Sequence, residues 1–148
     1  MVGIKAYGGY VPRRRLARST ILENTSWFNG ALKAYSKGER SMCNWDEDSL
    51  TMAVEASRDC LDKTRPDDIK AIYLASTTLP FTDRQNSGVL GTALNLGQNM
   101  MTMDITSSQR AATSGLVNAL NVAKGTGGSA LFATGEHRRS QTANNNEF

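Results

Sequence analysis

The sequence contains few residues that form disulfides or bind metals. Of its 148 residues, two are cysteine and one is histidine. Cys43 and Cys60 have no CxxC or Cys/His neighbour, so the sequence predicts neither a disulfide framework nor a metal motif. No structural zinc site is expected, because such a site needs several Cys and His ligands. We expect a protein of the reducing cytoplasm.

Long apolar runs and a strong charge of one sign are also missing. No apolar run approaches the ~20 residues that a membrane-spanning helix needs, and no signal-peptide core follows Met1. The formal net charge is only +3, and the basic clusters at 13–15 and 138–139 have no interleaved aromatic residues. Neither nucleic acid nor a membrane is therefore an expected partner.

The chain has the size and composition of one soluble domain. Its hydrophobic fraction is 39% and its charged fraction 21%, which are ordinary values for a globular protein with a core. Residues 142–148 resemble a loop that leads into another element. We therefore expect residues 1–148 to form one domain that further residues or a partner chain complete.

Strand and helix patterns alternate along the chain. Strands are predicted at 4–7, 69–75, 100–105 and 130–134, and helices at 18–24, 49–61, 86–94 and 108–123. Turns are expected at 66–68 and 125–128, with a partly helical connection over 27–40. The order β-α-α-β-α-β-α-β, with apolar strands and helical crossovers, predicts an α/β fold with a mainly parallel sheet and helices on both faces.

The junction between a strand and a helix at Met103–Leu116 carries the clearest chemical signal. A β-prone run ends in Asp104, hydroxyl residues follow, and a helix rich in Ala, Ser and Gly begins. Such a turn presents one side chain beside the free N–H groups of a helix N-terminus, and small residues let the helix lie close to the sheet. The layout suits an acyl-transfer site, but the residue at the turn is Gln109, which is not a nucleophile.

Several other segments carry a family pattern in their order and spacing. They are Gly3–Pro12, Lys37–Arg40, Asp46–Ser49, Met52–Ala56, Ile72–Pro80 and Asn86–Leu96. Together they resemble the N-terminal half of thiolase-superfamily enzymes, in particular 3-hydroxy-3-methylglutaryl-CoA synthase-like proteins and CoA-primed ketoacyl-carrier-protein synthases. The resemblance implies a thiolase-like βαβαβαββ half, a coenzyme A thioester as substrate and no covalently bound cofactor.

The same resemblance implies catalytic residues that this sequence lacks. Gln109 stands where the family has its acyl-accepting Cys, five residues after Asp104, and Thr77 stands near the family's general-base Glu. The family's catalytic His and Asn belong to a second half. Two readings of Gln109 stay open: it donates a hydrogen bond to a thioester carbonyl, or it only caps the helix start and fills the old pocket.

The resemblance also implies a binding region for coenzyme A. Trp27 and Arg40 resemble the family's adenine platform, and Arg138 or Arg139 would add charge for a phosphate. An indole can stack on adenine, and a guanidinium can pair with a phosphate. The alternative is a buried tryptophan and solvated arginines.

Other reactive side chains have ordinary structural explanations. Ser107 and Ser108 suit helix capping better than nucleophilic attack, because a serine nucleophile needs an adjacent base. His137 is expected on the surface, and Cys43 and Cys60 as packing residues. Three methionines beside the predicted strand are expected in the core or in a subunit interface: Met100, Met101 and Met103.

Three functions remain open. The first is an acyl-CoA-handling subunit or fragment that makes or breaks a C–C bond beside a thioester. The second is a non-catalytic partner of a Cys-bearing thiolase-like chain, and the third is decarboxylation of a malonyl-type thioester with Gln109. The resemblance implies homo- or hetero-oligomers with a thiolase-like chain and a small zinc-ribbon/OB-fold protein as a further partner.

Overall fold

The computed structural model describes residues 2–62, 68–142 and 144. They fall into two compact units, which are described separately. Unit 1 comprises Met1–Tyr10 and Asp48–His137, and unit 2 comprises Val11–Glu47 and Arg138–Phe148. The turn expected over 66–68 and the loop expected over 142–148 lie largely outside the described residues.

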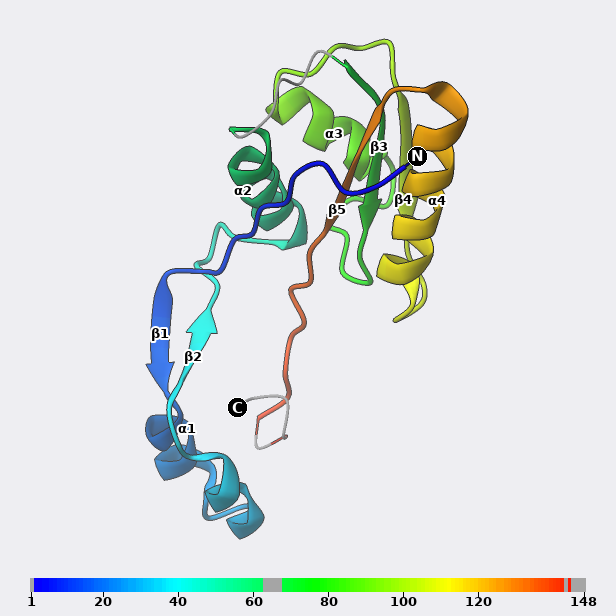
Figure 1. Cartoon of the computed structure of the whole chain (residues 1–148). Coiled ribbons are helices and arrows are strands. Elements are labelled where there is room, and N and C mark those ends of the chain that lie inside the picture. Colours follow the sequence, from blue (N-terminus) through cyan, green and yellow to red (C-terminus); the bar gives the residue numbers. More distant parts are fainter. Residues whose placement is uncertain (1, 63–67, 143, 145–148) are drawn as a thin grey trace. The chain divides into compact units, whose positions relative to one another are not determined.

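Unit 1 is a three-layer α/β unit (Figure 1). Its elements are α2 (Ser49–Leu61), β3 (Ile69–Ala75), α3 (Asn86–Ala93), β4 (Met101–Ile105), α4 (Ala111–Thr126) and β5 (Ser129–Thr134). The strand order is β4-β3-β5, and both pairings are parallel. Helices α2 and α3 cover one face of the sheet and α4 covers the other. The predicted α/β class and parallel sheet are confirmed.

The core of unit 1 is built around the central strand β3. Ile72 and Leu74 cluster with apolar residues of α2 and α3 on one face. Ala71 and Tyr73 pack with Ala119 of α4 on the other face. A strand that is buried on both faces needs a continuous apolar run, which explains why the sequence predicted β3 with its observed bounds.

The helix boundaries follow from local hydrogen bonds. Helix α2 begins with a capping box, in which the Asp48 carboxylate accepts from Thr51 N at 2.7 Å and Thr51 Oγ1 accepts from Asp48 N at 2.8 Å. Helix α4 begins three residues later than predicted. It also continues through part of the turn expected at 125–128 and ends at Gly127, whose φ of 69° is left-handed.

The predicted strand at Ile4–Tyr7 is wrong, because residues 2–10 form no strand. Their end is held by α2 instead: a Cβ at Gly8 would overlap the Cys60 nitrogen, and Gly9 N donates to Asp59 Oδ2 at 3.0 Å. The intrinsic β preference of this segment was overridden by its packing against a helix.

The methionines around β4 divide between core and surface. Met100 packs against the core cluster of α2, α3 and the sheet. Met101 and Met103 are exposed along β4, so the core prediction holds for Met100 alone.

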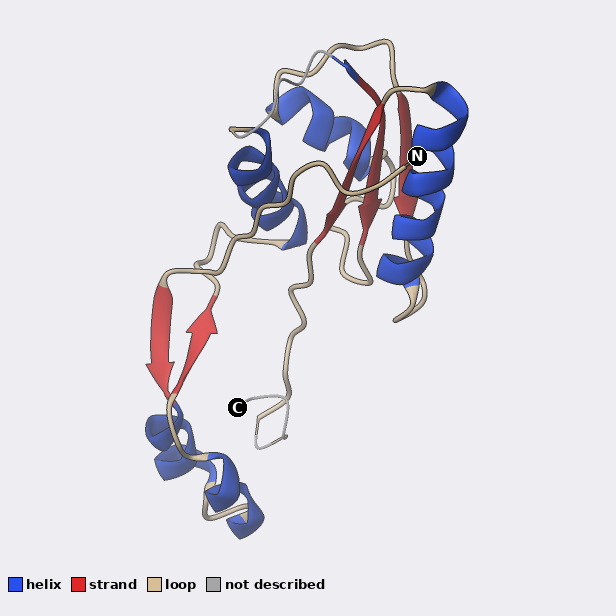
Figure 2. Cartoon of the chain, in the orientation of Figure 1, coloured by secondary structure: helices blue, strands red, loops and turns tan. Residues whose placement is uncertain are grey.

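Unit 2 contains a strand pair and two short helical segments (Figure 2). They are β1 (Arg14–Ala17), α1 (Arg18–Thr25), the 3-10 helix η1 (Gly30–Tyr35) and β2 (Glu39–Met42). Strands β1 and β2 are antiparallel, with Leu16 opposite Arg40. The sequence predicted α1 and the partly helical connection but missed both strands, because their charged residues do not alternate with apolar ones.

Candidate functional site

The candidate site lies at the carboxyl edge of the parallel sheet in unit 1. Two main-chain bonds hold the strand ends together beyond the ladder: Ser76 N donates to Ile105 O at 3.0 Å, and Gly135 N donates to Ala75 O at 3.4 Å. The segments that leave β3, β4 and β5 therefore meet at one edge. Ligands of open α/β sheets bind at this edge.

The turn after β4 has the compact geometry that the sequence suggested. Ser107 adopts a left-handed φ of 68°, which is uncommon for a residue with a side chain. Ser108 Oγ accepts from Arg110 N at 3.1 Å, and Ala111 N donates to Ser108 O at 2.9 Å. The predicted helix capping by Ser107 or Ser108 is wrong, because Arg110 is the N-cap residue of α4 and no side chain caps the helix; Ser108 stabilises the turn before it. Gln109 is exposed and precedes the first helical residue by two positions.

Helix α4 approaches the sheet closely behind this turn. Ala111, Gly115 and Ala119 are its buried residues, spaced one turn apart. A Cβ at Gly115 would lie 2.6 Å from Phe132 Cε2 and 3.1 Å from Ile105 Cδ1. The small residues of α4 therefore set its distance from the sheet, as the sequence indicated.

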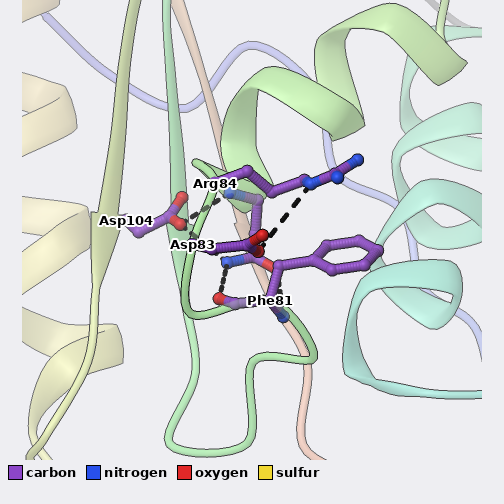
Figure 3. A network of polar contacts seen from close by, with 5 residues as sticks. Phe81, Asp83, Arg84 and Asp104 are labelled. Atoms are coloured by element: carbon purple, nitrogen blue, oxygen red, sulfur yellow. Dashed lines mark hydrogen bonds and ion pairs between the residues drawn. The ribbon is translucent and has the colours of Figure 1, made fainter.

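Asp104 connects β4 to the N-terminus of α3 (Figure 3). Its Oδ2 accepts from Asn86 N at 2.7 Å and from Asn86 Nδ2 at 2.9 Å, and its Oδ1 accepts from Ser87 N at 2.7 Å. Partial burial acts to raise the pKa of Asp104, but these hydrogen bonds outweigh it and hold the pKa below its usual value. The ionised carboxylate therefore has a structural role.

The loop before α3 is fixed by the same network. Asn86 Nδ2 donates to Phe81 O at 2.9 Å, and Phe81 N donates to Asn86 Oδ1 at 3.2 Å. The Arg84 guanidinium lies 5.0 Å from the centre of the Phe81 ring and 3.9 Å from Asp83 Oδ1 (Figure 3). This loop leads from the carboxyl end of β3 to α3, so the network orders one side of the site.

A carboxylate that sequence reasoning missed lies beside Thr77. Glu136 Oε1 accepts from Thr77 N at 2.8 Å, and Glu136 Oε2 accepts from Thr77 Oγ1 at 2.8 Å and from Thr78 Oγ1 at 3.3 Å. His137 N donates to Thr78 Oγ1 at 2.9 Å. The main chain of His137 therefore belongs to this network.

The strand register explains why Glu136 reaches Thr77. Ala75 pairs with Thr134, and these are the last residues of β3 and β5. Thr77 follows Ala75 by two positions, and Glu136 follows Thr134 by two positions. Gly135, between Thr134 and Glu136, has no room for a side chain, because a Cβ there would overlap the Ser49 carbonyl oxygen. The parallel register was the signal that could have found this contact.

The predicted coenzyme A residues all lie in unit 2, whereas Thr77 and Gln109 lie in unit 1. Trp27 is 83% exposed, which excludes the buried alternative. Its Nε1 donates to Asn24 O at 2.9 Å. The centres of the Trp27 and Phe28 rings lie 5.7 Å apart in an edge-to-face arrangement. Arg40 is half-buried on β2, and Arg138 and Arg139 are exposed.

Neither cysteine lies in the turns that follow β3, β4 and β5. Cys60 lies in α2, and Cys43 belongs to unit 2. Burial, together with the negative charge of Glu47, raises the pKa of the Cys43 thiol above its ordinary value. A thiol with a raised pKa is a poor nucleophile near neutral pH.

The described residues also lack two features. None of their helices is long and apolar enough to cross a membrane. In the same part of the chain, no group of three or more His, Cys, Asp or Glu residues is placed to hold a metal ion.

Comparison with known proteins identifies the fold and similar sequences. The fold is that of thiolase-like condensing enzymes. The solved structure of MvaS in complex with 3-hydroxy-3-methylglutaryl coenzyme A aligns with a TM-score of 0.82 and 21% identity, over 97% of this chain and 36% of that one. The priming β-ketosynthase of the R1128 polyketide pathway aligns with a TM-score of 0.80 and 18% identity, over 95% of this chain and 43% of that one.

Sequence comparison identifies related proteins. The hydroxymethylglutaryl-CoA synthase of Caldivirga maquilingensis is 31% identical over 128 residues, which are 83% of this chain and 36% of that protein. Over most of its length the chain is therefore similar to hydroxymethylglutaryl-CoA synthases. It spans about a third of the length of the curated relatives that it matches. No protein-family model matches it.

Proposed function

We propose that this chain is the acyl-CoA-binding part of a hydroxymethylglutaryl-CoA synthase-like enzyme, which makes or breaks a C–C bond beside a thioester. The observation that carries the proposal is the turn from β4 to α4, which presents Gln109 at the carboxyl edge of the sheet. Similarity to hydroxymethylglutaryl-CoA synthases supports it. Residues 1–148 would be the N-terminal thiolase-like half, completed by a C-terminal half or a partner chain.

In this proposal Gln109 binds the acyl group without a covalent bond. Its carboxamide nitrogen donates to the thioester carbonyl oxygen, and donors fixed before the reaction stabilise the charge that develops there. A carboxamide is not a nucleophile near neutral pH, so no acyl-enzyme forms at this position. Transfer of the acyl group to a thiol would need a cysteine from another part of the protein or from a partner.

Thr77 and Glu136 form the second part of the proposed site. Thr77 donates through its main-chain N–H and its hydroxyl to Glu136, which fixes the segment that leaves β3. Glu136 supplies a carboxylate next to the position where the family has a general base. An exposed carboxylate can accept a proton from the carbon beside a thioester. The catalytic His and Asn would come from the further half or the partner.

Unit 2 would bind the nucleotide part of coenzyme A. Trp27 would stack on the adenine, and Arg40 with Arg138 or Arg139 would pair with the phosphates. The exposure of the indole supports this role. Coenzyme A thioester is then the substrate, with no covalently bound cofactor, and the protein works in the cytoplasm.

The proposed partners are proteins as well as acyl-CoA. A thiolase-like chain, either a second copy or a Cys-bearing paralogue, would complete the catalytic residues. A small zinc-ribbon/OB-fold protein is a further proposed partner. Neither nucleic acid nor a membrane is proposed.

A non-catalytic partner subunit is the second candidate function. The resemblance favours it, because it implies that Gln109 and Thr77 stand where the family has its catalytic Cys and Glu. In this case the fold would serve to stabilise a Cys-bearing chain. Decarboxylation of a malonyl-type thioester with Gln109 is a third candidate, and it predicts release of carbon dioxide without acyl transfer.

Calorimetric titration with acetyl-CoA separates these candidates. We expect Gln109→Ala to weaken acetyl-CoA binding about fivefold, the effect of one lost hydrogen bond. Gln98→Ala is the matched control, because Gln98 is an exposed glutamine before β4, at the opposite end of the strand. Assays of acyl transfer and of carbon dioxide release run in parallel. If Gln109→Ala leaves both binding and turnover unchanged, the acyl-binding role of Gln109 is wrong.

A further inference from the structure

One threonine joins the segments that leave β3 and β5. Thr78 follows the end of β3 by three positions, and its Oγ1 lies 3.3 Å from Glu136 Oε2 and accepts from His137 N at 2.9 Å. Its main chain is fixed on both sides: Thr78 N donates to Ser76 Oγ at 3.0 Å, and Thr78 O accepts from Ser49 Oγ at 2.6 Å. All these residues belong to unit 1. Thr78 therefore links the start of α2 with the exits of both strands.

The residues that hold Thr78 in place are buried. Ser49 is the first residue of α2 and is inaccessible to solvent, and Ser76 is 1% exposed. The Ser49 carbonyl oxygen also lies against Gly135, where a Cβ would overlap it. Ser49 therefore fixes the position of Thr78 on one side and of the residue before Glu136 on the other. Buried, hydrogen-bonded supports of this kind hold functional side chains in one geometry.

The surrounding donors and acceptors give the Thr78 hydroxyl one direction. A threonine hydroxyl has one proton to donate and two lone pairs that accept. Ser76 Oγ already accepts from Thr78 N, and among the described residues Thr78 Oγ1, at 3.3 Å, is the acceptor that the buried Ser76 proton needs. Thr78 Oγ1 then accepts from both Ser76 Oγ and His137 N. Its single proton is left for Glu136 Oε2.

We propose that Thr78 is a positioning residue, which holds the Glu136 carboxylate beside Thr77 through this directed hydroxyl. A carboxylate has about four lone-pair sites for donors. Glu136 Oε1 accepts from Thr77 N at 2.8 Å and Oε2 accepts from Thr77 Oγ1 at 2.8 Å, so Thr78 supplies a further donor from the next residue. Donors from two successive residues fix both the place and the rotation of the carboxylate.

The inference rests on the proposed function, in which Glu136 removes a proton from the carbon beside the thioester. In that step the C–H bond breaks, Glu136 takes the proton, and the electron pair stays on the thioester as an enolate. A general base must lie within hydrogen-bond reach of the proton that it takes. A carboxylate that rotates away loses this position, so Thr78 is expected to affect the rate without touching the substrate.

Amide hydrogen exchange of the free 148-residue chain tests the positioning by itself. The Thr77 amide reports on Glu136, because Thr77 N donates to Glu136 Oε1. Thr78→Val removes the hydroxyl and keeps the shape of the side chain. We expect this variant to exchange the Thr77 amide about fivefold faster, the effect of one lost hydrogen bond. Thr78→Ser keeps the hydroxyl and should exchange this amide at the wild-type rate.

Exchange of the acetyl methyl protons of acetyl-CoA with deuterium oxide tests the effect on proton transfer. Thr78→Val should slow this exchange about fivefold, and Thr78→Ser should restore it. Thr82→Val is the matched control and should have no effect, because Thr82 is an exposed threonine of the same connection between β3 and α3. Thr78→Ala also lacks the hydroxyl, and it replaces Thr78→Val if urea denaturation shows that the valine variant does not fold.

Three results would overturn the inference. The first is that loss of the hydroxyl leaves the Thr77 amide unchanged, or leaves methyl exchange unchanged in a chain that catalyses it. The second is that Thr78→Ser is as impaired as Thr78→Val, which would assign the effect to packing of the methyl group. The third is an equal effect of Thr82→Val. A wild-type chain that exchanges no methyl protons would instead refute proton transfer by Glu136, and the Thr77 amide would still decide whether Thr78 positions the carboxylate.

Discussion

The two units of this chain differ in how far they bury their apolar side chains. Unit 1 buries a parallel sheet between helices, and β3 is almost completely inaccessible at its last five residues. Unit 2 buries Ile21 and Leu32 but exposes the rings of Trp27, Phe28 and Trp45. Exposed aromatic rings have an apolar face that a ligand or partner can cover.

Unit 1 therefore provides a packed scaffold, and unit 2 provides the exposed surface that we propose to bind the nucleotide. The strand–turn–helix geometry of the proposed acyl site depends on the packed core of unit 1. The proposed nucleotide surface belongs to unit 2, where substitution of an exposed ring removes little packing. We therefore expect core substitutions to change stability and ring substitutions to change binding.

The largest expected effect is loss of stability from the core of unit 1. Leu90 of α3 is fully buried against the sheet, so Leu90→Ala should lower the free energy of unfolding by about 2–5 kcal/mol. Val117→Ala, at an exposed position of α4, should change it by less than about 0.5 kcal/mol. Urea denaturation measures both values. Equal effects of the two substitutions would show that unit 1 lacks the described core.

Asp104→Asn should destabilise unit 1 by about 1–3 kcal/mol, because Asn86 and Ser87 lose a charged acceptor. The folded-state pKa of Asp104 is lowered, so its stabilisation is present above the unfolded pKa of about 3.9 and is lost as pH falls through the folded pKa. The free energies of unfolding of the wild type and the variant, measured with urea, should therefore converge as the pH falls from neutral to acid. The exposed Asp83→Asn is the control; an equally large effect there would contradict the role of Asp104.

Trp27→Ala tests the ligand surface of unit 2. Loss of a stacked base should weaken acetyl-CoA binding by about 1–3 kcal/mol, with little change in stability. Trp45→Ala is the matched control, since Trp45 is 92% exposed in the same unit and has no predicted role. Calorimetry gives both affinities. If the two substitutions have the same effect, the nucleotide surface has been placed wrongly.

Glu136→Gln should lower the free energy of unfolding by only about 0.5–1.5 kcal/mol, because the amide oxygen can keep part of the bonding to Thr77. If Glu136 also accepts a proton from the substrate, the variant should lose exchange of the acetyl methyl protons of acetyl-CoA with deuterium oxide. Proton NMR measures that exchange. Unchanged exchange would leave Glu136 with a structural role only.

The sequence predicted the elements whose signals are local. The bounds of β3 follow from one apolar run, and those of α2 from a capping box. The start of α4 was predicted too early, because the left-handed backbone of Ser107 delays the helix. Strands β1 and β2 depend on pairing between charged segments, for which a single sequence gives no periodic signal.

Part of the geometry of the candidate site was predicted for the same reason. The turn that carries Gln109 follows a strand that the sequence shows clearly, whereas Thr77 was a candidate through the family resemblance, and the roles of both residues stay predictions. Glu136 was overlooked because its contact with Thr77 joins residues 59 positions apart and depends on the register of β3 and β5.

The central claim is that the carboxyl edge of unit 1 binds the acyl end of a coenzyme A thioester. NMR titration of the ¹⁵N-labelled chain with acetyl-CoA and with free coenzyme A tests it most directly. We predict that both ligands shift the Trp27 indole signal and that only acetyl-CoA shifts the Gln109 side-chain amide and the Thr77 amide. Identical shifts with the two ligands, or no response of Gln109 to acetyl-CoA, would contradict the claim.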